Sequence, residues 1–250
     1  MGGAAVPASR AKPPATRPEP QPDAEGDAPQ PARALPVTGL VLAGGESRRM
    51  GRDKALLPTA RGPLLLHVAR TLATTCAEVL VVDRPPGRYR HLGLPVVLDR
   101  LPGRGPLAGL HAGLEAMRHA YGLVVACDMP GLTPAVARFL VQRALEAERR
   151  GTPVDAVVPL RRGRPEPLLA VYARRLAPVA EALLEQGRPP LRALLAAPGV
   201  RVAWVDEAEL RTIDPDLRCL VNLNTPADWA AWRRGQLPPD SPGPAGLPGG

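Results

Sequence analysis

Short apolar runs alternate with longer segments whose apolar residues recur at helical spacing, and this alternation is clearest in the first part of the chain. Strands are predicted at residues 37–42, 78–82, 95–98 and 122–127, and helices at 63–74, 106–120 and 133–150. Short apolar runs bounded by Gly, Pro or Asp are typical of buried strands. Their order along the chain predicts an α/β fold, in which a mostly parallel sheet lies between two layers of helices.

The rest of the chain carries a weaker pattern. Strands are predicted there at residues 155–159, 168–172, 200–205 and 219–221, and helices at 174–186, 190–197 and 226–234. The two ends differ from this region, because residues 1–36 hold nine prolines and no aromatic residue, and residues 235–250 are rich in Pro and Gly. Such segments bury too little apolar surface to fold. The predicted organisation is therefore a domain at 37–234 between two disordered tails.

Composition narrows the class of protein. The three cysteines, Cys76, Cys127 and Cys219, form no C-x-x-C pair, so neither a zinc site nor a disulfide framework is indicated, and a reducing cytoplasm is expected. No apolar run approaches membrane-spanning length, and a membrane location is not expected. The net charge of +8 suits nucleic acid or phosphorylated small molecules. Aromatic residues make up 3% of the chain, so small polyanionic substrates are favoured and no nucleic-acid partner is expected.

The loop after the first predicted strand carries the most specific chemistry. Residues 40–54 read Leu-Val-Leu-Ala-Gly-Gly-Glu-Ser-Arg-Arg-Met-Gly-Arg-Asp-Lys. Adjacent glycines let backbone N–H groups come close to an oxyanion or a base edge, and Arg48, Arg49 and Lys54 supply charge for a triphosphate. Arginine is abundant, whereas Lys54 is the only lysine besides Lys12 of the N-terminal tail. An ammonium and a guanidinium are not interchangeable where one charge must reach a single oxygen, so a lysine retained here indicates a phosphate.

This loop matches none of the common nucleotide or nucleophile motifs. It lacks the Gly-Lys-Ser/Thr ending of a Walker A motif, the G-x-G-x-x-G fingerprint and the G-x-S-x-G nucleophile elbow. The alternative to a nucleotide site is a surface turn with solvated arginines. The combination of several demanding residues favours the nucleotide site.

The same string resembles the signature of nucleotidyltransferases that activate phosphorylated cofactors and sugars. Its Leu42-Ala43-Gly44-Gly45 form is similar to the molybdenum cofactor guanylyltransferase family. Further matches follow in order at residues 105–109 (Gly-Pro-Leu-Ala-Gly), 127–130 (Cys-Asp-Met-Pro), 165–172 (Pro-Glu-Pro-Leu-Leu-Ala-Val-Tyr) and 222–226 (Asn-Leu-Asn-Thr-Pro). The resemblance covers residues 37–234. It implies a Rossmann-like nucleotidyltransferase fold, GTP and molybdenum-molybdopterin as substrates, Mg²⁺ as cofactor, and transient contact with molybdoenzymes or other cofactor-synthesis proteins.

Three aspartates follow predicted strands and, with Gly44, are expected to share one rim of the sheet. Asp128 ends the most apolar strand, and a carboxylate facing phosphates is what a Mg²⁺ ion needs. The resemblance implies nucleotide contacts for Asp99, which stands where the family has an acidic residue, and for Asp83, which stands where some members have Asn. Both aspartates could instead serve as turn-forming residues.

Residues for the second substrate are expected in the later motifs. The loop and helix start at Gly105, Pro106 and Leu107 can receive an anion. Asn222 and Asn224 are the only asparagines in the chain, and Asn224 could instead cap the last helix. Arg161, Arg162, Arg164 and Arg192 are predicted to form a basic rim for the pterin substrate, although each alone is compatible with a solvated surface position.

The predicted reaction is GMP transfer from GTP to the terminal phosphate of molybdopterin, with Lys54, Arg48 and Asp128 as catalytic residues and pyrophosphate as the leaving group. Leu42, Ala43, Gly44 and Gly45 are expected to bind the nucleotide through their backbone. Cytidylyl transfer to the pterin, or nucleotidyl transfer to a sugar phosphate, stays open. A non-catalytic nucleotide-binding protein is the alternative from another class.

Overall fold

An eight-stranded sheet forms the centre of the fold in the part of the chain that the computed structural model describes, residues 1–3, 34–45, 50–101 and 103–236. The described helices and strands all belong to one unit, Arg33–Gly250. The strands are β1 (Leu35–Leu42), β4 (Cys76–Asp83), β5 (Val96–Leu98), β6 (Tyr121–Ala126), β7 (Ala156–Arg161), β8 (Arg164–Pro165), β9 (Leu169–Ala173) and β10 (Val202–Val205).

The order of strands across the sheet is β10-β7-β9-β6-β1-β4-β5, and β8 pairs with β7. β1 runs parallel to β4 and β6, β4 is parallel to β5, and β10 is parallel to β7. β9 lies antiparallel to both β6 and β7, and β8 lies antiparallel to β7. The prediction of a mostly parallel sheet is confirmed. The two reversed strands were not predicted, because periodicity does not give strand direction.

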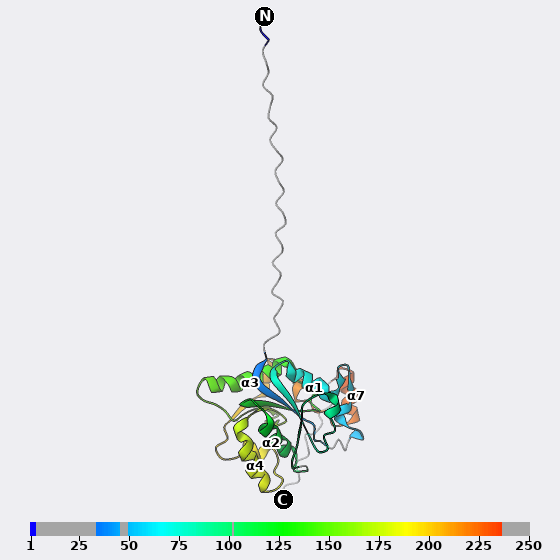
Figure 1. The fold of residues 1–250 in the computed structure, drawn as a ribbon, viewed down its shortest axis with the longest axis vertical. Coiled ribbons are helices and arrows are strands. Elements are labelled where there is room, and N and C mark those ends of the chain that lie inside the picture. The colour runs from blue at the N-terminus through cyan, green and yellow to red at the C-terminus, as the bar shows by residue number, and fades with distance from the viewer. Residues whose placement is uncertain (4–33, 46–49, 102, 237–250) are drawn as a thin grey trace. The chain divides into compact units, whose positions relative to one another are not determined.

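Helices cover both faces of the sheet (Figure 1), as predicted. On one face, apolar side chains of α1 (Leu64–Ala73), α3 (Pro134–Arg149) and α6 (Glu207–Arg211) join one hydrophobic core. On the other, α2 (Pro106–Ala116), α4 (Ala177–Glu185) and α5 (Arg192–Leu195) build a second core. Strand residues alternate between the two cores: Leu40 belongs to the second and Val41 to the first. This alternation is the period-two pattern of a sheet that is buried on both faces.

A third hydrophobic cluster joins the beginning and the end of the domain. It contains Met50, Leu57 and Leu64 from the region after β1, and Val221, Leu223 and Trp229 from the C-terminal region. Trp229 lies on α7 (Pro226–Arg233), whose first turn is closed by a capping box between Thr225 and Asp228. This cluster holds the segment that carries Lys54 against the segment that carries Asn224.

Several predicted boundaries are wrong. β1 begins at Leu35, whose N–H donates to the carbonyl of Thr75 at 2.7 Å, so the sheet starts two residues before the predicted domain boundary at 37. The predicted strand at 219–221 is a 3-10 helix, η5 (Arg218–Leu220), and the predicted helix at 190–197 is reduced to α5. The structure adds the two-stranded ribbon of β2 (Pro58–Thr59) and β3 (Gly62–Pro63), the strand β8 and the helix α6. The remaining described elements are the 3-10 helices η2 (Lys54–Leu56), η3 (Arg90–Leu92) and η4 (Arg174–Leu176).

The two predicted disordered tails lie almost entirely outside the described residues. Within the described residues, every helix is too short or too polar to cross a bilayer.

Candidate active site

The glycine loop after β1 forms a wall shared by two pockets. The Leu42 carbonyl accepts from the Cys127 N–H at 3.1 Å, and the Ala43 N–H donates to the Val82 carbonyl at 2.9 Å, so both residues are fixed by neighbouring strands. A Cβ added at Gly44 would meet the Arg84 side chain at 3.4 Å, and one added at Gly45 would meet no described atom within 4 Å. The described protein atoms therefore do not require glycine here. Both glycines line the two pockets, so the backbone here is open to close approach by a ligand.

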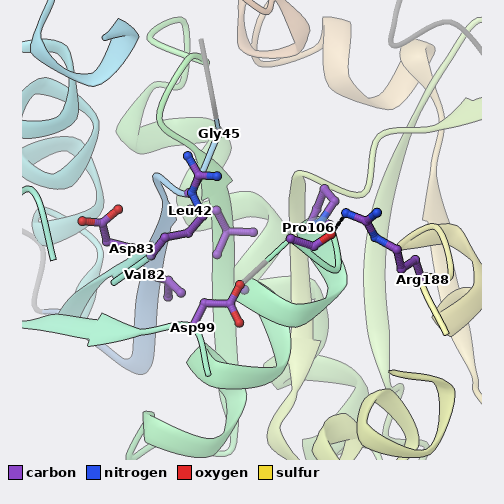
Figure 2. A pocket seen from close by; sticks show the side chains of 12 residues that line it. Leu42, Gly45, Val82, Asp83, Asp99, Pro106 and Arg188 are labelled. Carbon is purple, nitrogen blue, oxygen red and sulfur yellow. Dashed lines mark hydrogen bonds between the residues drawn. The ribbon is translucent and has the colours of Figure 1, made fainter. Parts of the chain in front are cut away.

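The larger pocket has a volume of about 400 Å³ and lies between the glycine loop and the start of α2. Figure 2 shows Asp83 and Asp99 on one side of this pocket and Arg188 on the other, beside Pro106. Its lining residues are Leu42, Gly44, Gly45, Val82, Asp83, Arg84, Asp99, Gly103, Gly105, Pro106, Gly109 and Arg188. Gly105 caps α2 with a φ of 83°, a conformation that disfavours residues with a side chain.

Two aspartates border the larger pocket. Asp83 is fully buried; its Oδ1 accepts from Arg88 Nη2 at 3.1 Å, and its Oδ2 has no hydrogen-bond donor among the described residues. Because Oδ2 is itself closed to solvent, the Asp83 carboxylate is not available to a molecule in the pocket, and its observed role is to hold Arg88. Asp99 accepts from the Leu101 N–H at 2.8 Å, and burial raises the pKa of its carboxyl group. Both aspartates thus occupy the expected rim, and Asp99 is the one available as an acceptor.

The smaller pocket has a volume of about 150 Å³, and Lys54 and Asp128 line it in direct contact with each other. Lys54 Nζ lies 3.1 Å from Asp128 Oδ2 and 2.8 Å from Asn224 Oδ1. The side chains of Lys54 and Asp128 are 13% and 19% exposed, so the ion pair is largely shielded from water. Charges in such surroundings interact more strongly than they do at an open surface.

The loop after β6 holds Asp128 in place. The Asp128 carbonyl accepts from the Leu223 N–H at 2.9 Å, which ties this loop to the C-terminal region. Gly131, three residues on, packs so closely against the Arg218 carbonyl that any Cβ would overlap it. Thr225, rather than Asn224, caps α7, which leaves the Asn224 side chain to bind Lys54. The alternative role of Asn224 as a helix cap is therefore wrong.

The predicted nucleotide residues gather as expected at the carboxyl ends of β1, β4, β5 and β6. Gly44 and Gly45 line both pockets, Asp83 and Asp99 line the larger one, and Lys54 and Asp128 line the smaller one. Arg48 and Arg49 lie outside the described residues.

The predicted acceptor-side residues are less well assembled. Among the described residues, Leu107, Arg164, Arg192 and Asn222 line neither pocket. Leu107 is wholly buried in the core beneath α2, so its side chain cannot bind a substrate. Arg164 is exposed on β8, Arg192 is exposed on α5, and Asn222 is half-buried beside Leu223.

Sequence reasoning missed four residues around the site. Arg84 and Arg188 line the larger pocket and Asp53 lines the smaller one. Arg188 donates to the Gly103 carbonyl. The two residues lie 85 positions apart in the sequence, so no sequence motif signals that contact. Glu166 is the fourth: burial raises the pKa of its carboxyl group to about 7, against the lowering effect of Arg161. The Pro-Glu-Pro string marks Glu166 as part of a family motif, but nothing in the sequence signals that its carboxyl group is buried.

Cys127 lines the smaller pocket next to Asp128, yet it is not poised as a nucleophile. Burial raises the pKa of its thiol, and the Asp128 carboxylate raises it further. A thiol with a raised pKa stays protonated at neutral pH and is a poor nucleophile.

A glycine loop at the edge of the sheet beside the shielded Lys54–Asp128 pair is the arrangement expected of a nucleotidyltransferase. The chain belongs to the MobA-like NTP transferase domain family, whose model matches residues 39–202.

Curated relatives agree with this assignment. The chain is 37% identical over 194 residues to a probable molybdenum cofactor guanylyltransferase of Pelotomaculum thermopropionicum, covering 78% of this chain and 90% of the relative. It is 36% identical over 190 residues to the molybdenum cofactor guanylyltransferase of Desulfosudis oleivorans, covering 76% of this chain and 90% of that protein.

A solved structure is similar as well. Molybdopterin-guanine dinucleotide biosynthesis protein A from Archaeoglobus fulgidus superposes with a TM-score of 0.66 at 29% identity, covering 78% of this chain and 95% of that one.

Proposed function

We propose that this protein transfers GMP from GTP to the terminal phosphate of molybdenum-molybdopterin, forming the molybdopterin guanine dinucleotide cofactor and releasing pyrophosphate. The family membership and the molybdenum cofactor guanylyltransferases among its relatives support this activity. The observation that carries it is the pair of adjoining pockets: one contains the Asp99 carboxylate, which is suited to a base or ribose, and the other is lined by the only lysine of the domain.

The chemistry needs little covalent help from the protein. The acceptor phosphate is ionised at neutral pH, so it can attack the α-phosphorus without a strong general base. One P–O bond forms between the acceptor oxygen and the α-phosphorus, and the bond to the β-phosphate oxygen breaks in line. Lys54 offsets the charge that develops on the transferring phosphates, and Gly44 and Gly45 hold the nucleotide against the sheet edge. Catalysis then rests on orientation and preorganised charge.

The residues present fit a Mg²⁺ ion at Asp128. Among the described residues, no three His, Cys, Asp or Glu side chains cluster as metal ligands. Mg²⁺ is commonly held by one or two carboxylates together with phosphate oxygens and water, so a single Asp128 carboxylate beside the triphosphate suits it. When bound, the ion would supply neutralising charge to the leaving pyrophosphate.

The Asp99 carboxylate favours guanine over cytosine. Guanine presents two neighbouring donors, N1–H and the exocyclic amine, whereas cytosine presents an amine beside a ring acceptor. Carboxylate acceptors satisfy the donors of guanine, and a mismatched buried acceptor costs about 1–3 kcal/mol. The amine of cytosine still pairs with a carboxylate, so its ring acceptor is the one mismatch, and this corresponds to a preference for GTP over CTP of about 5- to 160-fold in kcat/KM.

A direct competition tests the proposal. GTP and CTP are supplied together at limiting molybdopterin with Mg²⁺, and the dinucleotide product is identified by mass while pyrophosphate is measured. Guanine product in large excess supports the proposal. Equal incorporation or a cytosine product would assign the chain to cytidylyl transfer, and the absence of any pterin product would overturn the substrate assignment.

The proposed function also bears on the protein partners and the cellular location of the enzyme. Its product is a finished cofactor, so transient contact with molybdoenzymes or other cofactor-synthesis proteins is proposed for handing it on. Cys76, Cys127 and Cys219 are free thiols, a state that the reducing cytoplasm maintains, and this supports a cytoplasmic location.

A further inference from the structure

A buried tyrosine holds the carboxylate that precedes the catalytic lysine. Tyr89 is 1% exposed, and its hydroxyl lies 2.8 Å from both carboxylate oxygens of Asp53, which share its single proton. Burial and the Asp53 carboxylate both raise the pKa of the Tyr89 hydroxyl, so it remains a hydrogen-bond donor at any physiological pH. Asp53 is thus fixed from outside its own loop.

Arg88 ties the same carboxylate to the walls of both pockets. Its Nη1 lies 3.3 Å from Asp53 Oδ2, while its Nη2 donates to the Ala43 carbonyl at 3.0 Å and to Asp83 Oδ1 at 3.1 Å. The guanidinium also lies 4.7 Å from the centre of the Tyr89 ring, within the range of a cation–π interaction. One side chain therefore joins the glycine loop, the larger pocket and the lysine segment.

Asp53 fixes the position of the backbone at the start of η2, the short helix that carries Lys54. Asp53 Oδ1 accepts from the Ala55 N–H at 3.0 Å and so caps η2, whose first residue is Lys54. Lys54 is anchored at its tip by Asp128 and Asn224 and at its backbone by this cap. A carboxylate held by Tyr89 and Arg88 accordingly fixes the origin of the lysine side chain.

We propose that Tyr89 and Arg88 are positioning residues for the transfer reaction, acting through Asp53 to place the Lys54 ammonium at the phosphates. This inference rests on the proposed function, since it gives Lys54 its role. Through its contacts with Asp83 and Ala43, Arg88 also holds the larger pocket and Lys54 in a fixed relative position. A catalytic group misplaced by about 1 Å can cost about 10²-fold in rate. Tyr89 and Arg88 therefore affect the rate of transfer without touching the substrate.

The first test removes the single hydroxyl group. Tyr89→Phe should lower kcat about tenfold while changing the KM for GTP less than about threefold, because lysine placement matters most in the transition state. Tyr121→Phe is the matched control: Tyr121 is equally buried, and its hydroxyl donates to the Val154 carbonyl at 3.1 Å, away from both pockets. The control should keep its turnover.

A second readout needs no substrate. Lys12 and Lys54 are the only lysines, so protein grown on lysine labelled with ¹³C at Cε gives two signals, and Lys12 serves as the internal reference. Tyr89→Phe should shift the Lys54 signal and leave the Lys12 signal in place. Tyr121→Phe should shift neither.

A double-mutant cycle separates positioning from general support of the fold. In a Lys54→Met background, Tyr89→Phe should lower turnover less than about twofold further, since the group it positions is gone. If Tyr89→Phe does not fold, Arg88→Lys gives the same test, because it keeps the charge but loses the fork that reaches three acceptors.

The outcomes distinguish this inference from the proposed function. Full additivity in the cycle, an unmoved Lys54 signal, or equal loss in the Tyr121→Phe control would overturn the positioning role. If the wild-type enzyme makes no guanine product, the proposed function fails, and the labelled lysine still decides whether Tyr89 fixes Lys54.

Discussion

Exchanging Lys54 for arginine or methionine gives the most direct test of the mechanism. Lys54 Nζ contacts Asp128 Oδ2 at 3.1 Å and Asn224 Oδ1 at 2.8 Å inside a pocket of about 150 Å³. A guanidinium is wider and planar, so it cannot replace the compact ammonium in both contacts. Lys54→Arg therefore retains the charge but should still lose activity.

The magnitudes follow from the surroundings of the pair. Removing one preorganised electrostatic contact costs about 10²–10³-fold in kcat, or about 2.7–4 kcal/mol. Fold stability should change less: Asp128 is 19% exposed and water can partly compensate its charge, so Lys54→Met should cost about 1–2 kcal/mol. For a domain of this size that corresponds to a fall in Tm of about 2–8 °C.

The assay measures pyrophosphate release at saturating GTP and acceptor, alongside a thermal melt. Lys12→Met is the control, because it removes the other lysine of the chain and should leave kcat unchanged. A folded Lys54→Met enzyme with kcat within about threefold of the wild type would refute the assigned role. Full activity in Lys54→Arg would refute the argument from shape and leave only the requirement for charge.

Four further predictions follow from the site and its supports. Gly45→Ala should retain the Tm of the wild type and lose at least about tenfold in GTP affinity, measured by calorimetry. Gly131→Ala should give little folded protein, because its Cβ would overlap a backbone carbonyl. The opposite pattern would contradict the assigned role of the glycine loop. Asp128→Asn should abolish turnover and weaken the Mg²⁺ dependence of GTP binding, and identical metal titrations would argue against a metal role. Deleting residues 1–33 should leave turnover and Tm intact, and a loss of either would place that segment in the domain. The raised pKa of Glu166, about 7 against 4.5, means that the folded state favours the protonated form, so its contribution to stability falls as pH rises between these values; the Tm of Glu166→Gln should therefore gain on the wild type from pH 5 to pH 8, and a constant difference would contradict it.

Local pattern was enough to predict the first half of the fold and the nucleotide side of the site. Buried parallel strands are nearly continuous apolar runs, and β1 and β6 stand out for that reason. The residues after such strands meet at one edge of the sheet, and this placed Gly44 and Asp128 correctly.

Contacts between distant segments were not accessible in the same way. The 218–221 region contains a Cys-Leu-Val run that resembles a strand, but Asp214 Oδ2 binds the Cys219 N–H at 2.8 Å and favours a 3-10 turn. The hydrogen bond between Tyr89 and Asp53 links residues 36 positions apart and has no local signature. The acceptor-side arginines were assigned from charge alone, and charge does not say which pocket a side chain reaches.

The placement of β9 affects how the chain can fold while it is being synthesised. β6 is buried along its whole length, yet one of its two hydrogen-bonding edges is completed only by residues 169–173. A nascent chain that has emerged only through α3 therefore presents a fully apolar strand with an open edge, the type of surface that pairs with other chains. A fragment ending at residue 150 should aggregate, even though it contains β1, Lys54 and Asp128. The C-terminal region thus acts on solubility as well as on the site, because it closes the edge on which the first half of the protein would otherwise associate.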